Sequence, residues 1–311
     1  MTTEPTSADA RRVLLLAHVG RERARDVARQ FAGALAGHGL VVRLLTEEAE
    51  ALGLESGPRL ELVADPDEAA SGCELAVVIG GDGSILRAAE LTHESDTPLL
   101  GINLGHVGFL AEAELADLES AIESIAHQDY LIEDRLTVGV TVHHDGRTIY
   151  DTFALNEASV EKAARERMIE LVVEIDGRPL SRWGCDGVVC ATPTGSTAYN
   201  FSAGGPIVWP SVQALCVVPL SAHALFARPM VVAPDSVVAL ELVSEGDGTG
   251  VLWCDGRRTV DLPRGARVEV RRGARPVRLV RLHQELFTDR LVAKFGLPVS
   301  GWRGAREPGD A

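Results

Sequence analysis

The stretch Gly-Gly-Asp-Gly-Ser at residues 80–84 constrains this chain more than any other. It directly follows residues 75–79, a short, continuous and largely β-branched apolar run, which is typical of a buried strand. Apolar residues at near-helical spacing then predict a helix from Ser84. Because glycines allow close backbone approach and a helix N-terminus attracts anions, this unit predicts a phosphate-binding turn. The alternative is a plain strand-to-helix turn capped by Asp82.

Asp82 is the unusual member of this loop. A carboxylate repels phosphate unless it binds a metal or takes up a proton, so Asp82 indicates a role beyond anion binding. Arg87 follows one helical turn later. It is placed for a phosphate contact, although an ordinary surface arginine remains open.

Composition excludes several classes of protein. The 311 residues carry a net charge of -15, so no broad cationic surface exists for nucleic acid or an anionic membrane. The only two lysines, Lys162 and Lys294, lie outside glycine-rich loops, which excludes a Walker A motif. Five scattered cysteines and the lack of a long apolar run predict a soluble, cytoplasmic protein with reduced thiols.

The first part of the chain alternates strand and helix patterns. This alternation predicts an α/β domain with an open parallel sheet. The expected strands are residues 13–17, 40–45, 75–79 and 97–103, and the expected helices are 21–37 and 115–127. The first strand–helix turn lacks Gly-x-Gly-x-x-Gly, which argues against a standard dinucleotide-binding dehydrogenase.

After about residue 135 the pattern becomes that of antiparallel strands. Asp-Gly pairs at 145–146, 176–177 and 255–256 predict tight hairpins. We expect a mainly antiparallel, sandwich-like β domain. The full expectation is a disordered leader at 1–10, the α/β domain at 11–134, the β domain at 135–277 and a segment at 278–311, with a helix at 287–295, that returns to the α/β domain.

A second glycine-rich segment, residues 184–206, combines five glycines with threonines, serines and Tyr199. Such a segment can surround a nucleotide, with hydroxyls and amides for phosphate or ribose and a flat ring for adenine; a tight loop of the β domain is the alternative. The pair Asn156-Glu157 either caps a turn or binds ribose hydroxyls and a metal. The single histidines His106 and His223 are interpreted as structural.

Taken together, these motifs resemble the NAD kinase family, in a bacterial, actinobacterial-like form. The Gly-Gly-Asp-Gly motif stands at residues 80–83 and the Asn-Glu motif at 156–157. The long signature containing Thr-Pro-Thr-Gly-Ser-Thr-Ala-Tyr is met at every fixed position from Asp186 to Pro206, and matches continue at 101–105 and 223–229. The likeness covers nearly the whole chain. Gly-Gly-Asp-Gly is shared with lipid kinases and phosphofructokinases, whereas the long signature is highly specific.

The resemblance implies transfer of a phosphoryl group from ATP, or from polyphosphate, to the adenosine ribose 2′-hydroxyl of NAD, giving NADP. Asp82 would accept the proton of that hydroxyl, Gly83 would lie along phosphate and Arg87 near the diphosphate. Asn156 and Glu157 would hold the ribose or adenine of NAD. The other expected contact positions are Arg167, Gly184, Asp186, Thr194, Thr197, Ala198, Tyr199, Asn200, Phe201, Ser202 and Arg257. The resemblance also implies Mg²⁺ or another divalent metal, held mainly through the ATP phosphates, and a homodimer or homotetramer.

Two positions depart from the family pattern. Ser84 stands where threonine is usual, which keeps the hydroxyl, and Gly184 replaces a basic side chain seen in some relatives, which leaves only a backbone contact there. Two alternative functions remain. A non-catalytic NAD(P)(H) sensor would keep the long signature and tolerate loss of Asp82, and a lipid kinase would need a membrane-facing patch that the acidic charge disfavours.

Overall fold

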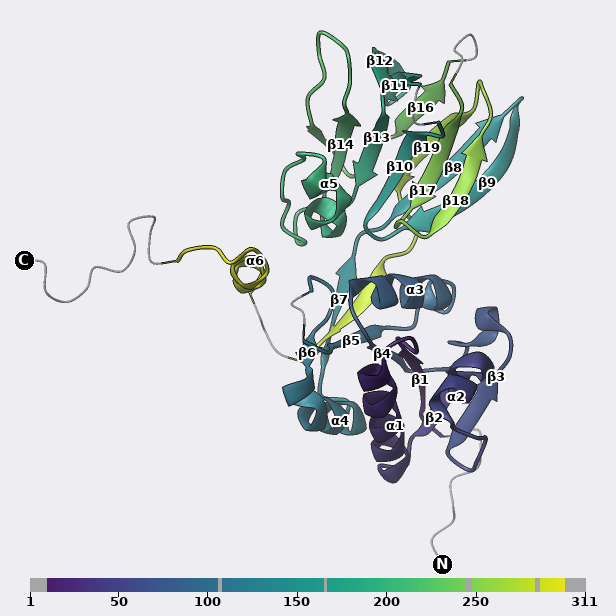
Figure 1. Ribbon diagram of the computed structural model, residues 1–311, viewed down its shortest axis with the longest axis vertical. Coiled ribbons are helices and arrows are strands. Elements are labelled where there is room, and N and C mark those ends of the chain that lie inside the picture. The colour runs from purple at the N-terminus through teal and green to yellow at the C-terminus, as the bar shows by residue number, and fades with distance from the viewer. Residues whose placement is uncertain (1–9, 106–107, 165–166, 244–247, 283–285, 300–311) are drawn as a thin grey trace, which may run out of the picture. The chain divides into compact units, whose positions relative to one another are not determined.

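The computed structural model describes residues 10–105, 108–164, 167–243, 248–282 and 286–299 (Figure 1). The chain divides into two compact units. The continuous stretch Asp134–Val277 forms unit 2, while the residues before and after it together form unit 1.

Unit 1 is built on one eight-stranded sheet. Its order is β3-β2-β1-β4-β5-β20-β7, with β6 paired to β5. The pairs β1–β2, β1–β4, β2–β3, β4–β5, β5–β6 and β5–β20 are parallel. The strands are β1 (Arg12–Ala17), β2 (Val41–Leu45), β3 (Leu60–Val63), β4 (Leu75–Ile79), β5 (Leu99–Asn103), β6 (Ala113–Glu114), β7 (Leu131–Arg135) and β20 (Val277–Arg281).

Helices cover both faces of this sheet. Its helices are α1 (Glu22–Gly37), α2 (Thr46–Leu52), α3 (Asp82–Thr92), α4 (Leu118–His127) and α6 (Phe287–Phe295), with short 3-10 turns η1 (Pro66–Glu68) and η2 (Leu115–Asp117). Helices α1, α2 and α4 share a core with alternate residues of β1, such as Val13 and Leu15. Helix α3 lies on the face where Gly101 of β5 leaves room for Ile85.

Unit 2 is a sandwich of two six-stranded antiparallel sheets. One sheet has the order β15-β14-β13-β10-β17-β18 and the other β12-β11-β16-β19-β8-β9. The strands are β8 (Val138–His144), β9 (Arg147–Ala154), β10 (Glu157–Lys162), β11 (Ile169–Ile175), β12 (Arg178–Cys185), β13 (Gly187–Ala191), β14 (Leu215–Leu220), β15 (Met230–Val232), β16 (Val238–Leu242), β17 (Gly250–Cys254), β18 (Arg258–Leu262) and β19 (Arg267–Arg272).

The two faces of β13 have different partners. Val188 and Cys190 belong to the core between the sheets. Val189 and Ala191 face the other way, where Tyr199 and Val208 pack on them. The segment between β13 and β14, which contains the 3-10 turn η3 (Thr194–Thr197) and α5 (Tyr199–Ser202), therefore covers the outer face of this sheet (Figure 1).

Both predicted sheet types are confirmed: unit 1 has a largely parallel sheet with helices, and unit 2 is a mainly antiparallel sandwich. Helix α6, near the C-terminus, belongs to unit 1. Boundaries differ locally. The helix after the glycine loop begins at Asp82 rather than Ser84, and the predicted helix 115–127 is divided into η2 and α4. Residues 1–9 of the expected leader lie outside the described residues. None of the described helices has both the length and the apolar character that spanning a membrane requires.

Candidate functional site

The glycine loop lies where the winding of the parallel sheet reverses. From β1 the chain continues outward to β2 and β3, whereas β4 and β5 extend the sheet from the other side of β1. In open α/β sheets ligands bind beyond the carboxyl ends of the strands at this reversal. Residues 80–83 follow the carboxyl end of β4 directly, so topology alone selects this loop as a site.

The first glycine of the loop, Gly80, is required by close packing. A Cβ atom at Gly80 would collide with the hydroxyl of Ser84. Gly81 is the N-cap residue, and its carbonyl accepts hydrogen bonds from Ser84 N at 2.9 Å and Ile85 N at 3.2 Å. Gly83 is exposed in the first turn of α3. The N-terminal end of an eleven-residue helix is thus accessible next to Asp82.

Asp82 is held in a fixed orientation by a segment distant in sequence. Its Oδ2 accepts a hydrogen bond from Phe109 N at 3.1 Å, and its Oδ1 accepts one from Leu110 N at 3.2 Å. Gly108 permits this approach, because a Cβ atom there would overlap Oδ1. The half-buried carboxylate is therefore oriented by two backbone donors.

Arg87 lies one helical turn beyond Asp82 and has a definite partner. Its guanidinium pairs with Glu48, whose side chain is nearly inaccessible to solvent. The second oxygen of Glu48 accepts a hydrogen bond from Ala17 N, at the end of β1, at 3.0 Å. The sequence prediction did not include Glu48, since a single glutamate in a short helix gives no local signal.

In unit 2, the segment 192–197 is tied to Asn156. Thr192 N donates to Asn156 O at 2.9 Å, and the Thr192 hydroxyl donates to Leu155 O at 2.6 Å. A Cβ atom at Gly195 would overlap the backbone carbonyl of Asn156. The two motifs separated in sequence are therefore in direct contact.

The Asn156-Glu157 pair is organised by Asp255, for which the sequence pattern predicts only a role in a turn. The buried Asp255 carboxylate accepts hydrogen bonds from the backbone N–H groups of Leu155 at 3.0 Å, Asn156 at 2.7 Å and Glu157 at 3.4 Å. It also pairs with Arg258 at 2.9 Å. Three donors and a cation compensate this buried charge.

Glu157 is buried in the same cluster, and desolvation, followed by the nearby Asp255 carboxylate, raises the pKa of Glu157 to about 8. One of its carboxylate oxygens, Oε2, has no hydrogen-bond partner. The raised pKa favours the protonated form of Glu157, and in that form its carboxyl group can both donate and accept a hydrogen bond.

Tyr199 adds a half-buried ring to this cluster. Burial, together with Glu161, Glu157 and Asp186, raises the pKa of Tyr199. Asp186 in turn pairs with Lys162, and the hydrogen bond from Lys162 lowers the pKa of Asp186. The structure thus brings together Asn156, Glu157, Asp186 and Tyr199.

The remaining predicted positions are more dispersed. Thr194 is buried, with its hydroxyl 3.5 Å from Arg135 Nη1. The Asn200 amide donates to Ser196 O at 3.1 Å and Pro206 O at 2.9 Å, which makes Asn200 a brace of its own segment. Gly184 accepts a backbone hydrogen bond from His223 at 2.8 Å. The exposed positions are Arg167, Phe201, Ser202 and Arg257, the partly exposed ones are Thr197 and Ala198, and His106 lies outside the described residues.

Family models match both halves of the chain. The model of the ATP-NAD kinase N-terminal domain matches residues 13–130, and that of the ATP-NAD kinase C-terminal domain matches residues 155–282. The chain belongs to the NAD kinase family. Among curated relatives, it is 59% identical to an NAD kinase of Thermobifida fusca over 308 residues, covering 97% of this chain and 94% of the relative. It is 58% identical to NAD kinase 2 of Streptomyces avermitilis, covering 96% and 99%.

Solved structures of NAD kinases share the fold. The yeast NADH kinase, solved with NADH, superposes with a TM-score of 0.86 at 22% identity, covering 94% of this chain and 89% of that one. The Archaeoglobus fulgidus NAD kinase, solved with ATP, gives a TM-score of 0.68 at 24% identity, covering 91% and 98%. At these identities the likeness establishes the fold alone.

The donor groups present suit a metal that arrives with the nucleotide. Among the described residues, no group of three or more His, Cys, Asp or Glu side chains could hold a metal ion. Asp82 supplies a single oriented carboxylate beside the helix end. Mg²⁺ in nucleotide sites is commonly bound by one or two carboxylates together with phosphate oxygens, so these residues fit a metal carried by ATP.

Proposed function

We propose that Asp82 accepts the proton of the adenosine ribose 2′-hydroxyl when this chain transfers a phosphoryl group from ATP to NAD. The observation that carries the proposal is the fixed carboxylate: two backbone N–H groups orient Asp82 at the reversal point of the sheet, at the start of a helix. Phosphoryl transfer passes through a loose transition state, so catalysis depends mainly on positioning and on charge neutralisation. A carboxylate is basic enough for this task because the proton leaves late.

The phosphates of the substrates are assigned to the exposed end of α3. Gly83 and the neighbouring backbone N–H groups supply donors there, and the positive end of the helix dipole favours negative charge. Arg87 adds a cation one turn later, and its pairing with Glu48 keeps the guanidinium close to the end of β1. A divalent metal bound to ATP would neutralise further phosphate charge, with Asp82 as the protein carboxylate beside it.

The adenosine part of NAD is assigned to the cluster around Asn156 and Glu157. A protonated Glu157 offers one donor and one acceptor, which suits ribose hydroxyls or the adenine edge. Tyr199 offers an aromatic face. The other assigned contact positions are Arg167, Gly184, Asp186, Thr194, Thr197, Ala198, Asn200, Phe201, Ser202 and Arg257.

The decisive experiment compares Asp82→Asn with the unchanged chain. NAD, Mg²⁺ and either ATP or polyphosphate are supplied, and an NADP-specific dehydrogenase reports the product. We expect Asp82→Asn to lose about 10²- to 10⁴-fold in kcat, the usual contribution of a general base, while calorimetry still detects NAD binding. Asp26→Asn, at an exposed position of α1, is the matched control. Near-normal turnover in Asp82→Asn would refute the assignment.

The same assay separates this function from a sensor. A sensor on this fold would bind NAD(P)(H) and give no product with either donor, whereas the proposed enzyme gives NADP with at least one. We further infer a cytoplasmic homodimer or homotetramer from the family resemblance. Sedimentation velocity would show a single 33.2 kDa species if that inference about assembly is wrong.

A further inference from the structure

The segment that orients Asp82 is itself held by the C-terminal helix. Phe109 and Leu110 supply the two N–H donors to the Asp82 carboxylate. The opposite side of this segment faces α6 within unit 1. Arg290, in the middle of α6, is 6% exposed, so its charge needs partners inside the protein.

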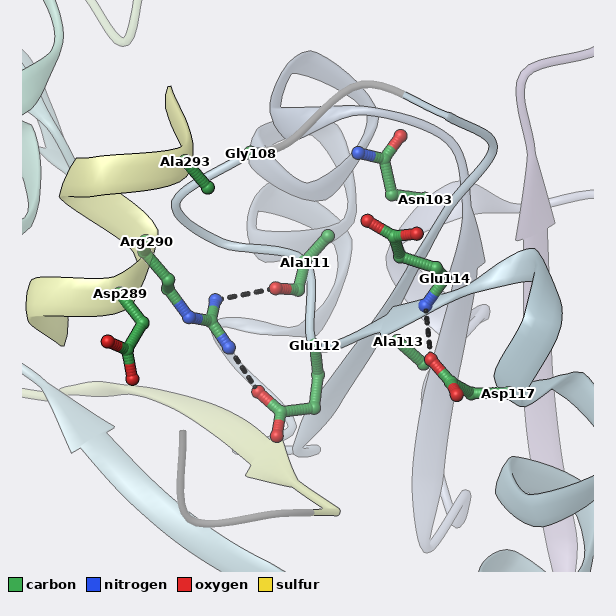
Figure 2. A pocket seen from close by; sticks show the side chains of 10 residues that line it. All are labelled: Asn103, Gly108, Ala111, Glu112, Ala113, Glu114, Asp117, Asp289, Arg290 and Ala293. Carbon is green, nitrogen blue, oxygen red and sulfur yellow. Dashed lines mark hydrogen bonds and ion pairs between the residues drawn. The ribbon is translucent and has the colours of Figure 1, made fainter. Parts of the chain in front are cut away.

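Arg290 finds those partners in the same segment. It donates to Phe109 O at 3.2 Å and to Ala111 O at 2.6 Å through Nη1, and to Glu112 Oε2 at 2.6 Å through Nη2. Figure 2 shows the guanidinium reaching from α6 toward Ala111 and Glu112. One carbonyl that Arg290 binds, Phe109 O, therefore lies between the two N–H groups that Asp82 binds, and the other, Ala111 O, follows them along the chain.

Aromatic packing links the same two elements. The ring of Phe109 lies 5.9 Å from that of Phe287 and 6.0 Å from that of Phe295, measured between ring centroids. These two residues stand at the two ends of α6. Phe109 is consequently fixed through both its backbone and its side chain.

Glu112 completes the support. Its carboxylate is almost fully buried, and it also pairs with Arg281 of β20 at 2.6 Å and accepts Leu282 N at 3.1 Å. Gly108, Glu112 and Arg290 also line a cavity of about 270 Å³ (Figure 2). The segment is therefore held from two sides: β5 accepts a hydrogen bond from Glu112 N at Gly101 O (2.9 Å), and α6 supplies the Arg290 contacts next to the open space of the cavity.

We propose that Arg290 is a positioning residue for the phosphoryl transfer: it fixes residues 109–111 so that the N–H groups of Phe109 and Leu110 orient the Asp82 carboxylate. The inference rests on the proposed role of Asp82. Small displacements of a reacting group can reduce the rate by about two orders of magnitude. Loss of the Arg290 contacts would displace the two N–H donors and let the carboxylate rotate, without removing a group that touches the substrate.

The test uses Arg290→Met in the full chain, with Arg11→Met as a control in which a more exposed arginine loses the same kinds of partner. Arg11 also pairs with one glutamate, Glu74, at 2.6 Å and donates to two carbonyls, those of Ile125 and Ala126. It directly precedes β1 and so lies at the amino ends of the parallel strands, whereas Asp82 follows their carboxyl ends. We expect Arg290→Met to lower kcat about 10- to 100-fold with little change in KM for NAD or ATP, and Arg11→Met to lower only the unfolding midpoint.

A double variant decides whether Arg290 acts through Asp82. In an Asp82→Asn background, Arg290→Met should cause no further loss of kcat. Two results would overturn the inference while leaving Asp82 as the base. One is a kcat of the double variant that is reduced by the product of the two single-variant losses, and the other is a normal kcat in a folded Arg290→Met variant. Normal turnover in Asp82→Asn alone would overturn both proposals. If Arg290→Met does not fold, Phe295→Leu loosens the same segment without exposing a buried charge, and normal kcat in that variant overturns the inference.

Discussion

Glu157 shows how a single residue can set the pH dependence of unit 2. Its pKa is raised from 4.5 to about 8, first by desolvation and then by the charge of Asp255. A raised pKa means that the folded chain binds the proton more tightly than the unfolded chain does. The resulting stabilisation is fully present below about pH 4.5 and is lost as the pH rises through about 8.

We therefore expect Glu157→Gln to flatten the pH profile of stability. Between pH 5 and 8, the free energy of unfolding of the unchanged chain should fall by about 1 kcal/mol per pH unit more than that of the variant. Urea unfolding at pH 5, 6, 7 and 8 measures both slopes. Burial also raises the pKa of Asp255. Asp255 therefore changes the free energy of unfolding with pH in the same direction in the unchanged chain and in Glu157→Gln. Parallel profiles would show that Glu157 is ionised in the folded chain.

At the scale of elements, the Asp-Gly turns were the most dependable signal in the sequence. All three have positive φ at both residues, as in Asp176 (53°) and Gly177 (72°), which is the geometry that a two-residue hairpin needs. At 255–256 the strand register pairs Cys254 with Arg258, so that this hairpin closes over three residues. One of the three does more than turn the chain. Asp255 accepts three backbone hydrogen bonds from residues 155–157, so a hairpin turn also shapes the Asn-Glu motif.

Asp255→Ala should accordingly destabilise the protein much more than Asp145→Ala. Both substitutions place alanine at a positive φ before a glycine, but the Asp145 side chain is 87% exposed. The difference in the free energy of unfolding should be at least about 2 kcal/mol, because buried N–H groups lose their acceptor only in Asp255→Ala. Denaturant unfolding of both variants gives this difference. If the two variants lost the same free energy of unfolding, Asp255 would contribute through the turn conformation and not as a hydrogen-bond acceptor.

Elements with a strong local pattern were predicted closely, and those without one were missed. The runs that form β4 and α6 were located to the residue. Strand β12 was missed because it contains Pro179 and Gly184 and exposes much of its length, and the short helix α2 was missed among charged residues.

The site was predictable only as far as its motifs extend. The loop and Asp82 are contiguous, and a local pattern reveals them. The residues that support them come from elsewhere: Phe109 lies 27 positions from Asp82, Glu48 lies 39 from Arg87, and Arg290 lies 181 from Phe109. Such contacts are set by the packing of α6 and the order of the sheet, which hydrophobic periodicity does not encode.

On the scale of the whole molecule, the two units differ in how the chain builds them. Unit 2 is one continuous stretch with its own core, whereas unit 1 needs two separate stretches. We expect a fragment of residues 134–277 to fold alone. A fragment of residues 10–133 lacks β20 and α6 and should be protease-sensitive. Circular dichroism and limited proteolysis of both fragments test this, and an unfolded 134–277 fragment would contradict it.

The position of β20 has a consequence for how the protein is made. This strand lies between β5 and β7 in the sheet, yet it is synthesised after the whole of unit 2. Until it leaves the ribosome, the sheet that carries Asp82 has a missing strand, and its β5 edge is open to incorrect pairing. A chain made only as far as residue 272 would therefore contain every strand of the β sandwich but neither β20 nor α6 of the half that carries Asp82, so that competence for catalysis is gained only after these two elements have been made.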